Sequence, residues 1–456
     1  MGKNLLLVNP WIYDFAAYDL WIKPLGLLYL ASLLRENGYH ITYLDCLDIS
    51  DPLMQDYLVR NHIQIKRKSD GSGQFPKTFL EKPYPLRNVP RRYGRYGITL
   101  DIFNQRLREA PRPEAVLVTS MMTYWYPGAA KVIELVRSYD PRIPILLGGN
   151  LVTLCPQTAH SLGADFCLPG EGEEAVLTTL QGLTGQPIRY EPDPENLDSL
   201  PYPAFDLQNR VDYVLLQTSR GCPFRCVYCA SGLVYPKFRR RSAASVVREI
   251  EDSLRKYRIR HFVFSDDALC SGAGEHLIPI LRSVEAKGIR GYFHTPNALH
   301  AREITDDLAR LLYRTGFQTL RLGFETSDPI RQKLTGGKVN NEQFQQAIGN
   351  LRTAGFSRAQ IGVYILAGLP GQTIEEVEES VDFVFKTGAY PILTEFSPIP
   401  GTPLWPHCLE SSPFDLSSDP LVHNNSILPC QSPRLSWEDY LRLKLRIRAR
   451  CGAEII

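Results

Sequence analysis

The chain has 456 residues, room for about three domains, with 44% hydrophobic and 22% charged residues as in ordinary globular proteins. Its 51 basic and 49 acidic side chains leave a net charge of +2, so no global field favours nucleic acid or membrane as a partner. Apolar runs such as Leu25–Leu34 are too short to span a membrane and no signal peptide is evident, so we expect a cytoplasmic protein.

Short apolar runs alternate with helical periodicity through the first part of the chain. The expected strands are Leu5–Val8, Ile41–Leu44, Val116–Thr119, Ile145–Leu147 and Phe166–Leu168. The expected helices are Leu27–Glu36, Ala129–Ser138, Pro156–Leu162 and Glu173–Leu180. This alternation predicts α/β architecture, a Rossmann-like doubly wound parallel sheet that binds its ligand beyond the carboxyl ends of the strands. We place this domain at residues 1–195, ending in a Pro-rich linker, Glu191–Pro203.

An insertion breaks this rhythm between about residues 51 and 113. No clear alternation holds there, and Lys66–Gln74 is typical of a turn-rich loop. From Arg60 to Gly97 there are ten Lys or Arg against two acidic residues, Asp70 and Glu81. A solvated surface is the first interpretation of such a charge run. A lid, or a subsite for an anionic substrate, is the second, because long loops in compact domains are often functional.

A second α/β series follows the linker, at residues 196–404. Its expected strands are Tyr213–Gln217, His261–Ser265, Gly291–His294, Thr319–Phe324, Gln360–Leu366 and Ile392–Phe396. Its expected helices are Ala244–Lys256, Glu275–Lys287, Asp306–Arg314, Glu342–Ala354 and Ile374–Thr387. These repeats predict a partial TIM-type (βα)6 barrel, with its active site at the carboxyl ends of the strands. Residues 405–456 form a short tail with a basic helix near Trp437–Arg450.

Three cysteines follow the first barrel strand with the spacing C-x3-C-x2-C: Cys222, Cys226 and Cys229. Three thiolates on one loop can bind three irons of a [4Fe–4S] cluster, which ordinarily takes four Cys ligands. The missing ligand leaves one iron open, and an open metal position is where substrate chemistry takes place. A zinc site would more readily pair two C-x-x-C units, and the sequence has no second unit. We therefore prefer an iron–sulfur site over zinc or structural cysteines.

From Val214 to Leu404 the sequence resembles the radical S-adenosylmethionine (SAM) superfamily. Beyond the cysteines, the resemblance rests on Phe264–Asp267, Gly323–Thr326, the Gly-Leu-Pro-Gly turn in Ala367–Thr373 and the Pro-Gly-Thr-Pro element in Ser397–Leu404. It implies that the three cysteines hold the cluster and are catalytic, and that SAM chelates the open iron. One electron then cleaves SAM to give a 5′-deoxyadenosyl radical, with a donor such as a flavodoxin or ferredoxin as a partner.

The same resemblance implies SAM-binding residues around the carboxyl ends of the barrel strands. They are Tyr228, Asp266, Asp267, Asn297, Glu325, Tyr364, Gly368 and Leu369. The Tyr228 ring can lie along adenine, Glu325 can accept from the SAM ammonium or ribose, and Gly368 permits close backbone approach.

Two residues depart from the family pattern. Thr326 stands where the family has Ser, and Gln372 where it often has Glu. Both replacements keep hydrogen-bonding capacity, so they leave the assignment in place. For Asp266 and Asp267, capping of the following helix is an alternative interpretation.

Pro24–Ala31, Ser120, Gly148–Asn150 and Gly170–Glu173 lie at the carboxyl ends of the expected strands. With these motifs the first domain resembles the cobalamin-binding domain of one branch of these enzymes. The resemblance implies cobalamin-binding residues at Pro24, Leu25, Gly26, Ser120, Met122, Tyr124, Trp125, Gly148, Gly149, Asn150, Gly170, Glu171 and Gly172. The Asp-x-His-x-x-Gly motif that supplies a histidine to cobalt in other cobalamin proteins is absent, so we expect another group, or none, on the lower face of cobalt. The aromatic loop Met121–Tyr126 can shield that face, with ordinary packing as the alternative.

Seven further cysteines have no ligand spacing: Cys46, Cys155, Cys167, Cys270, Cys408, Cys430 and Cys451. Structural thiols are the default interpretation. Cys270 is of interest because it follows the second barrel strand, near the expected mouth of the site. A methylthiotransferase would need a second cluster on Cys46, Cys155 and Cys167, whose surroundings resemble a cobalamin domain instead.

The leading functional hypothesis is radical methyl transfer from SAM, by way of methylcobalamin, to an unactivated carbon or, less often, phosphorus. Oxidative cyclisation or ring rearrangement without net methylation is the alternative within this class. A non-catalytic cobalamin and iron–sulfur sensor is the alternative of another class. The substrate, a small molecule or a peptide, is left open.

Methyl transfer also carries a geometric expectation, because reacting groups must come into near contact. The Ser120–Tyr126 loop and the Gly148–Asn150 turn should lie opposite Cys229, Glu325 and Gly368. The linker Glu191–Pro203 would then connect the two domains without contact to either cofactor.

Overall fold

The computed structural model describes residues 2–451, which form two compact units. The first unit runs to Asp212 and includes the short segment Asp419–Val422, while the second begins at Tyr213 and holds the rest. Each unit is built around one parallel sheet. No helix within the described residues is both long and apolar enough to cross a membrane.

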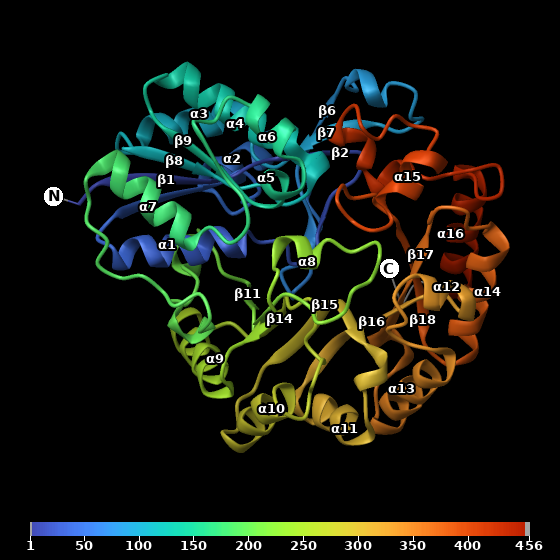
Figure 1. Ribbon diagram of the computed structural model, residues 1–456. Helices are drawn as coiled ribbons and strands as arrows, with labels where there is room; N and C mark the ends of the chain where they lie inside the picture. The colour runs from blue at the N-terminus through green and yellow to red at the C-terminus, as the bar shows by residue number, and fades with distance from the viewer. Residues whose placement is uncertain (1, 452–456) are drawn as a thin grey trace. The chain divides into compact units, whose positions relative to one another are not determined.

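The sheet of the first unit is parallel and doubly wound, as predicted, with the order β10-β9-β8-β1-β4. Its strands are β1 (Asn4–Asn9), β4 (His40–Asp45), β8 (Ala115–Val118), β9 (Ile145–Gly148) and β10 (Phe166–Leu168). Its helices are α1 (Leu25–Glu36), α4 (Tyr126–Tyr139), α5 (Asn150–Leu154), α6 (Pro156–Ser161) and α7 (Glu173–Thr184). Figure 1 shows α1 and α7 on one face and α4 on the other. The order reverses between β1 and β8, the point at which such sheets bind ligands.

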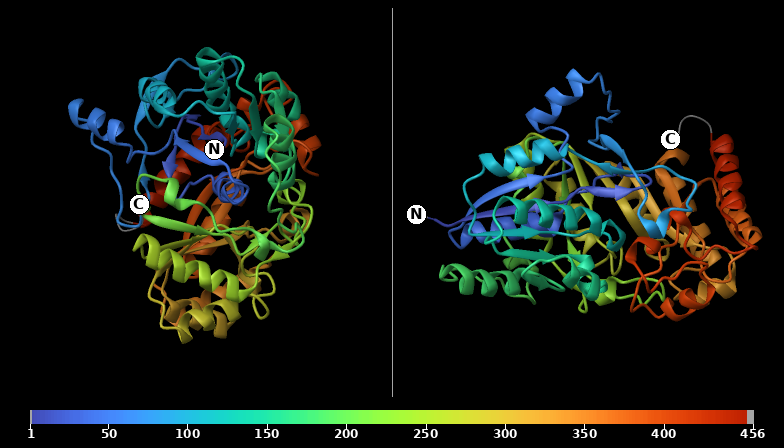
Figure 2. Two further views of the ribbon diagram at one scale, coloured as in Figure 1. Left: turned by 90° about the vertical axis from the view of Figure 1, so that its left-hand side faces the viewer. Right: turned by 90° about the horizontal axis from the view of Figure 1, so that it is seen from above.

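The insertion is more regular than the sequence indicated. It contains α2 (Pro52–Arg60), β5 (Gly73–Gln74), β6 (Lys77–Leu80), β7 (Tyr93–Tyr96) and α3 (Leu100–Glu109). Strand β7 pairs with β6 and with β2 (Ile12–Asp14), and β5 pairs with β3 (Tyr18–Asp19), all antiparallel. The partner strands β2 and β3 lie far back in the chain, so local periodicity could not reveal the pairing. Helix α2 projects from the rest of its unit in both views of Figure 2.

The second unit is a six-stranded parallel sheet in sequential order, which confirms the partial (βα)6 barrel. Its strands are β11 (Tyr213–Leu216), β14 (His261–Phe264), β15 (Tyr292–His300), β16 (Phe317–Glu325), β17 (Ile361–Ala367) and β18 (Tyr390–Glu395). Its helices are α9 (Ala243–Tyr257), α10 (Leu277–Ala286), α11 (Asp306–Thr315), α12 (Pro329–Leu334), α13 (Asn341–Ala354) and α14 (Ile374–Lys386). Most of these helices line the outer side of the curved sheet (Figure 1).

The tail carries α15 (Trp405–Ser411), two short 3-10 turns at Pro420–His423 and Asn425–Ile427, and α16 (Trp437–Cys451). Helix α16 is the predicted basic helix, and it packs against α14 and β18. Its Arg446 and Arg450 pair with Glu378 and Asp382 on α14. Acidic side chains of the barrel therefore form ion pairs with part of the positive charge on α16.

Candidate active site

The cysteine loop begins directly beyond the carboxyl end of β11. Its first residues form β12 (Ser219–Arg220), which pairs with β13 (Arg239–Arg240) and turns the chain across the end of the barrel. Gly221 follows with a φ of +81°, and a Cβ there would lie 2.6 Å from the Lys237 carbonyl oxygen. Only glycine fits this turn, which aims the cysteines away from the sheet.

Two distant segments clamp the middle of the loop. The Val227 N–H donates to the Thr335 carbonyl (3.4 Å), and the Leu404 N–H donates to the Val227 carbonyl (2.9 Å). Gly336, with a φ of +125°, lies so close that a Cβ would be 3.0 Å from Cys226 Cα. The cluster loop, the end of the Pro-Gly-Thr-Pro element and the turn after α12 thus meet at one place.

The three thiols are free and lie partly open to solvent. Burial, with smaller contributions from the Cys229 and Cys226 thiols, raises the pKa of Cys222 to about 11, so the three groups lie near one another. Across the described residues, no three His, Cys, Asp or Glu side chains converge closely enough to hold one metal ion. In a [4Fe–4S] cluster each cysteine binds a different iron atom. The three thiols must therefore be neighbours, but they need not converge on a single metal position. The donor set fits a [4Fe–4S] cluster.

Glu325 ends β16 in a strained conformation beside this loop. Its φ is +64°, and a register shift interrupts the β16–β17 ladder there. Lys338 Nζ lies 2.7 Å from Glu325 Oε1, and both side chains are largely buried. Strain at a barrel end is a frequent mark of a functional position. Sequence reasoning missed Lys338, although its Thr-Gly-Gly-Lys turn was visible.

The two adjacent aspartates lie in different surroundings. Asp266 is buried, and its Oδ1 accepts from the Thr218 N–H (3.0 Å) and from the Thr218 and Ser219 hydroxyls (2.8 and 2.6 Å). Asp266 thus braces the base of the cysteine loop. Asp267 is exposed and accepts from Ser231, close to Cys222 and Cys229. The helix-capping alternative is wrong, because the N-cap of α10 is His276.

Further expected SAM residues lie within β15 and β17. The Asn297 amide donates to the Ser265 carbonyl (2.9 Å), and the Tyr364 hydroxyl donates to the Pro296 carbonyl (2.7 Å). Tyr228 lies beside Glu325 and Cys226, and burial raises the pKa of its hydroxyl. These contacts bring the expected residues to the carboxyl end of the barrel, where their roles toward SAM stay predictions.

The Gly368 turn is held by Gln372. Its Oε1 accepts from the Gly368 and Leu369 N–H groups (2.9 and 3.2 Å), and its Nε2 donates to the Leu366 carbonyl (3.0 Å). An amide both accepts and donates here, which an ionised Glu cannot do. Gly368 has a φ of +91°, and a Cβ there would lie 2.8 Å from Leu428 of the tail. The close approach at Gly368 is therefore to the tail.

In the first unit, the ends of β8 and β9 are interlocked. The Ser120 hydroxyl donates to the Gly148 carbonyl (2.8 Å) and accepts from the Leu151 N–H (3.1 Å). The Asn150 amide donates to the Met121 carbonyl (2.7 Å). Gly149, with a φ of +92°, would place a Cβ 2.2 Å from the Ser120 carbonyl oxygen. These residues fix the shape of the sheet's edge.

The remaining glycines at this edge leave room above the backbone. A Cβ built on Gly26 or Gly170 would meet no atom within 4 Å, and one on Gly148 or Gly172 would meet only ordinary contacts. Pro24 and Leu25 lead into α1, and Gly170 and Glu171 lie between β10 and α7. Glycines that leave open space beyond the strand ends suit the approach of a large, flat ligand, so these residues fit cobalamin.

The aromatic loop divides between core and surface. Tyr124 is 3% exposed, as the packing interpretation expected. Trp125 is half-buried, its indole N–H donates to Asp14 (2.7 Å), and it lines a small cavity between the ends of β1 and β8. Met122 is half-buried. Met121 lines the same cavity as Trp125, so the half-buried members of the loop include residues open to a ligand.

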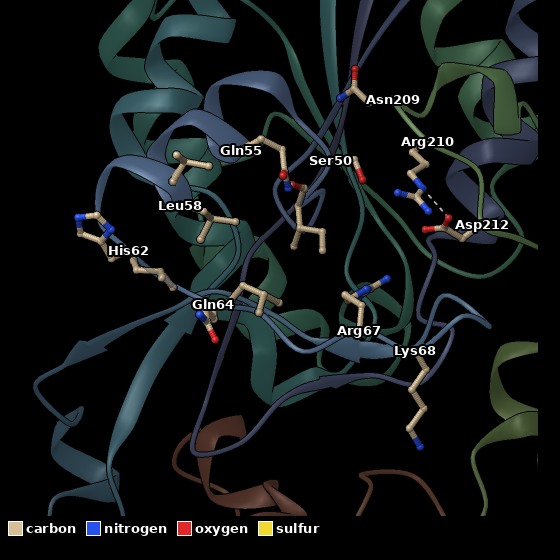
Figure 3. Close-up of a pocket in the computed structure, with 14 residues that line it drawn as sticks. Ser50, Gln55, Leu58, His62, Gln64, Arg67, Lys68, Asn209, Arg210 and Asp212 are labelled. Atoms are coloured by element: carbon tan, nitrogen blue, oxygen red, sulfur yellow. Dashed lines mark hydrogen bonds and ion pairs between the residues drawn. The ribbon is translucent and has the colours of Figure 1, made fainter.

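The basic insertion, together with Asn209, Arg210 and Asp212, lines an open cavity of about 800 Å³ under α2. Figure 3 shows Arg67 and Lys68 on one side of it and His62 on the other. Arg67 pairs with Asp19 (2.9 Å), and Arg210 with Asp212 (2.6 Å). Part of the positive charge is therefore balanced locally, and both interpretations of the insertion stay predictions.

Comparison with known proteins gives a consistent result. The radical SAM superfamily model matches residues 216–384, and the B12 binding domain model matches residues 97–179. An uncharacterized methyltransferase of Pyrococcus horikoshii is 27% identical over 66% of this chain and 70% of its own. The cytidylyl-2-hydroxyethylphosphonate methyltransferase of Streptomyces wedmorensis is 22% identical over 91% of this chain and 83% of its own. A similar solved structure is that of the radical SAM methyltransferase TsrM from Kitasatospora setae, with cobalamin and a [4Fe–4S] cluster bound. It superposes on this chain with a TM-score of 0.65 at 18% sequence identity. The superposition covers 90% of this chain and 79% of that one.

Proposed function

We propose that this chain, which belongs to the cobalamin-binding radical SAM enzymes, transfers a methyl group from SAM to an unactivated carbon or phosphorus centre. The observation that carries the proposal is the pairing, in one chain, of an open cobalamin-type sheet edge with a three-cysteine barrel mouth. Relatives named as methyltransferases support it, including one that aligns with 91% of the chain.

Different residues at the barrel mouth have different roles in binding the cluster and SAM. Cys222, Cys226 and Cys229 hold the cluster, and their missing fourth partner leaves SAM a place on iron. When bound, the cluster supplies the electron that cleaves SAM, and cobalamin carries the methyl group. Asp267 and the Lys338–Glu325 pair lie close to the cysteines, where they offer both charges to the amino acid end of SAM.

The shared-site expectation is part of this proposal. The Ser120 and Gly148 edge must face the barrel mouth, because a methyl group can reach a substrate radical only at near contact. Small displacements between reactants are costly in such reactions.

Products of SAM provide a test that needs no knowledge of the substrate. Methyl transfer through cobalamin predicts both S-adenosylhomocysteine and 5′-deoxyadenosine from the anaerobically reconstituted enzyme under reducing conditions. Oxidative cyclisation or rearrangement would give 5′-deoxyadenosine alone, and a sensor neither. Replacing Cys222, Cys226 and Cys229 together by Ala should abolish the cluster and 5′-deoxyadenosine, while Cys167→Ala in the other unit should leave both. A full cluster in the triple variant would overturn the assignment.

A further inference from the structure

Two cysteines of the second unit, Cys408 and Cys430, lie side by side. Cys408 is in α15 and fully buried, and Cys430 follows the second 3-10 turn of the tail with 4% of its surface exposed. Both are free, and each thiol shifts the pKa of the other, so the two thiols are neighbours. Ser412 ties the same segments together, because its N–H donates to the Cys408 carbonyl (3.0 Å) and its hydroxyl to the Pro429 carbonyl (2.7 Å).

The segment between the two cysteines, residues 409–429, is called the strap here. Its Leu428 covers Gly368, and its His423 carbonyl accepts from the Ser397 hydroxyl (2.7 Å). Its residues Asp419–Val422 belong to the first unit, where Asp419 accepts from the Tyr126 hydroxyl (3.1 Å). The strap therefore contributes to both units and returns to its starting point at the cysteine pair.

We propose that Cys408 and Cys430 are an oxidation site whose reversible disulfide closes the strap into a covalent loop. This cysteine chemistry is separate from the cluster and does not depend on the reaction proposed above. A loop closed at its base loses most of its freedom to open, since cross-linking removes the extended states of the segment.

The oxidant we assign is a small disulfide such as oxidised glutathione. The Cys430 thiolate attacks one sulfur of that disulfide and releases one glutathione thiolate, which leaves a mixed disulfide on Cys430. Cys408 then loses its proton and attacks the Cys430 sulfur, which releases the second glutathione. The two protein thiols are oxidised by two electrons, and one oxidised glutathione is reduced to two thiols.

The surroundings favour this order of events. The neighbouring Cys408 thiol lowers the pKa of Cys430, which makes Cys430 the attacking thiol. Between α15 and α16 the tail has only short 3-10 turns and irregular backbone. Because Leu421, Ile427 and Leu428 of the strap are buried, the oxidant reaches the pair when the strap opens locally.

Peptide mapping of the holoenzyme tests the proposal directly. The reconstituted protein is treated anaerobically with oxidised glutathione, quenched with N-ethylmaleimide and digested. Trypsin leaves both cysteines in one peptide, because no Lys or Arg occurs between Lys386 and Arg434, whereas cleavage at Glu410 separates them. We expect the Glu410-cleaved halves to stay joined until reduced, and the strap amides to exchange hydrogen at least about tenfold more slowly than in the reduced protein.

Variants distinguish this pair from non-specific oxidation. Cys408→Ser and Cys430→Ser should each lose the joined peptide, while Cys270→Ser, another buried cysteine of the second unit, should retain it. Complete alkylation of Cys408 and Cys430 after oxidation, or their linkage to other cysteines, would overturn the proposal. Neither readout uses enzymatic activity, so failure here leaves the proposed reaction untouched.

Discussion

Replacement of Gln372 by Ala should loosen the Gly368 turn and weaken SAM binding. The Gln372 side chain is 2% exposed, and its loss leaves the Gly368 and Leu369 N–H groups without an acceptor. A buried donor left unpaired costs about 1–3 kcal/mol, so the two together cost about 4 kcal/mol. For a unit of this size, that corresponds to a fall of about 10 °C in Tm.

The assay is differential scanning calorimetry of the anaerobic holoenzyme, with the KM for SAM measured from 5′-deoxyadenosine release. We expect KM to rise about tenfold, which is 1.4 kcal/mol of lost binding. Gln372→Glu keeps the acceptor but loses the donor to the Leu366 carbonyl, so it should recover only part of the Tm. The matched control is Gln346→Ala on the exposed face of α13, whose amide bonds only to Asn350 (2.9 Å). A Gln372→Ala protein as stable as the control would refute this account of the turn.

Four further outcomes follow from the same contacts. Glu249→Ala should lower the free energy of unfolding by about 3–5 kcal/mol, because it removes the carboxylate that pairs with the buried Arg241. Glu251→Ala breaks an exposed ion pair with Lys287 and should cost less than about 1 kcal/mol. Calorimetry of both variants measures the difference. Lys338→Met should weaken SAM binding at least about tenfold by leaving Glu325 buried without its cation, and Lys338→Arg should restore part of it in the same KM assay. Burial raises the pKa of Asp266 to about 6, so the folded chain holds this proton more tightly and stability falls as pH rises from about 4 through 6. Asp266→Asn should therefore show a smaller drop in Tm between about pH 4 and 6.5. Electron paramagnetic resonance of the cob(II)alamin form should lack nitrogen superhyperfine splitting, and its presence would count against the predicted absence of a histidine ligand.

The sequence by itself determined the two sheets and the kind of chemistry. Alternation of apolar strands with amphipathic helices is a local property, and every expected strand of both parallel sheets is present. The cysteine spacing is local too, because Cys222, Cys226 and Cys229 need only one turn after one strand. The sequence analysis missed the helices α2 and α3 of the insertion, and it missed strands whose partner lies far along the chain. The antiparallel sheet of the insertion depends on β2, which precedes β7 by about eighty residues in the printed sequence.

Only the tertiary structure decided how the site is supported. Asp266 and Asp267 look equivalent in sequence, yet one braces Thr218 from below while the other is exposed, because successive residues leave a strand in opposite directions. The reach of Lys338 to Glu325 depends on how the turn after α12 folds back onto the cysteine loop. The contact of Leu428 with Gly368 and the meeting of Cys408 with Cys430 arise where the tail returns to the barrel. Such contacts are set by packing between segments distant in sequence, which no local pattern records.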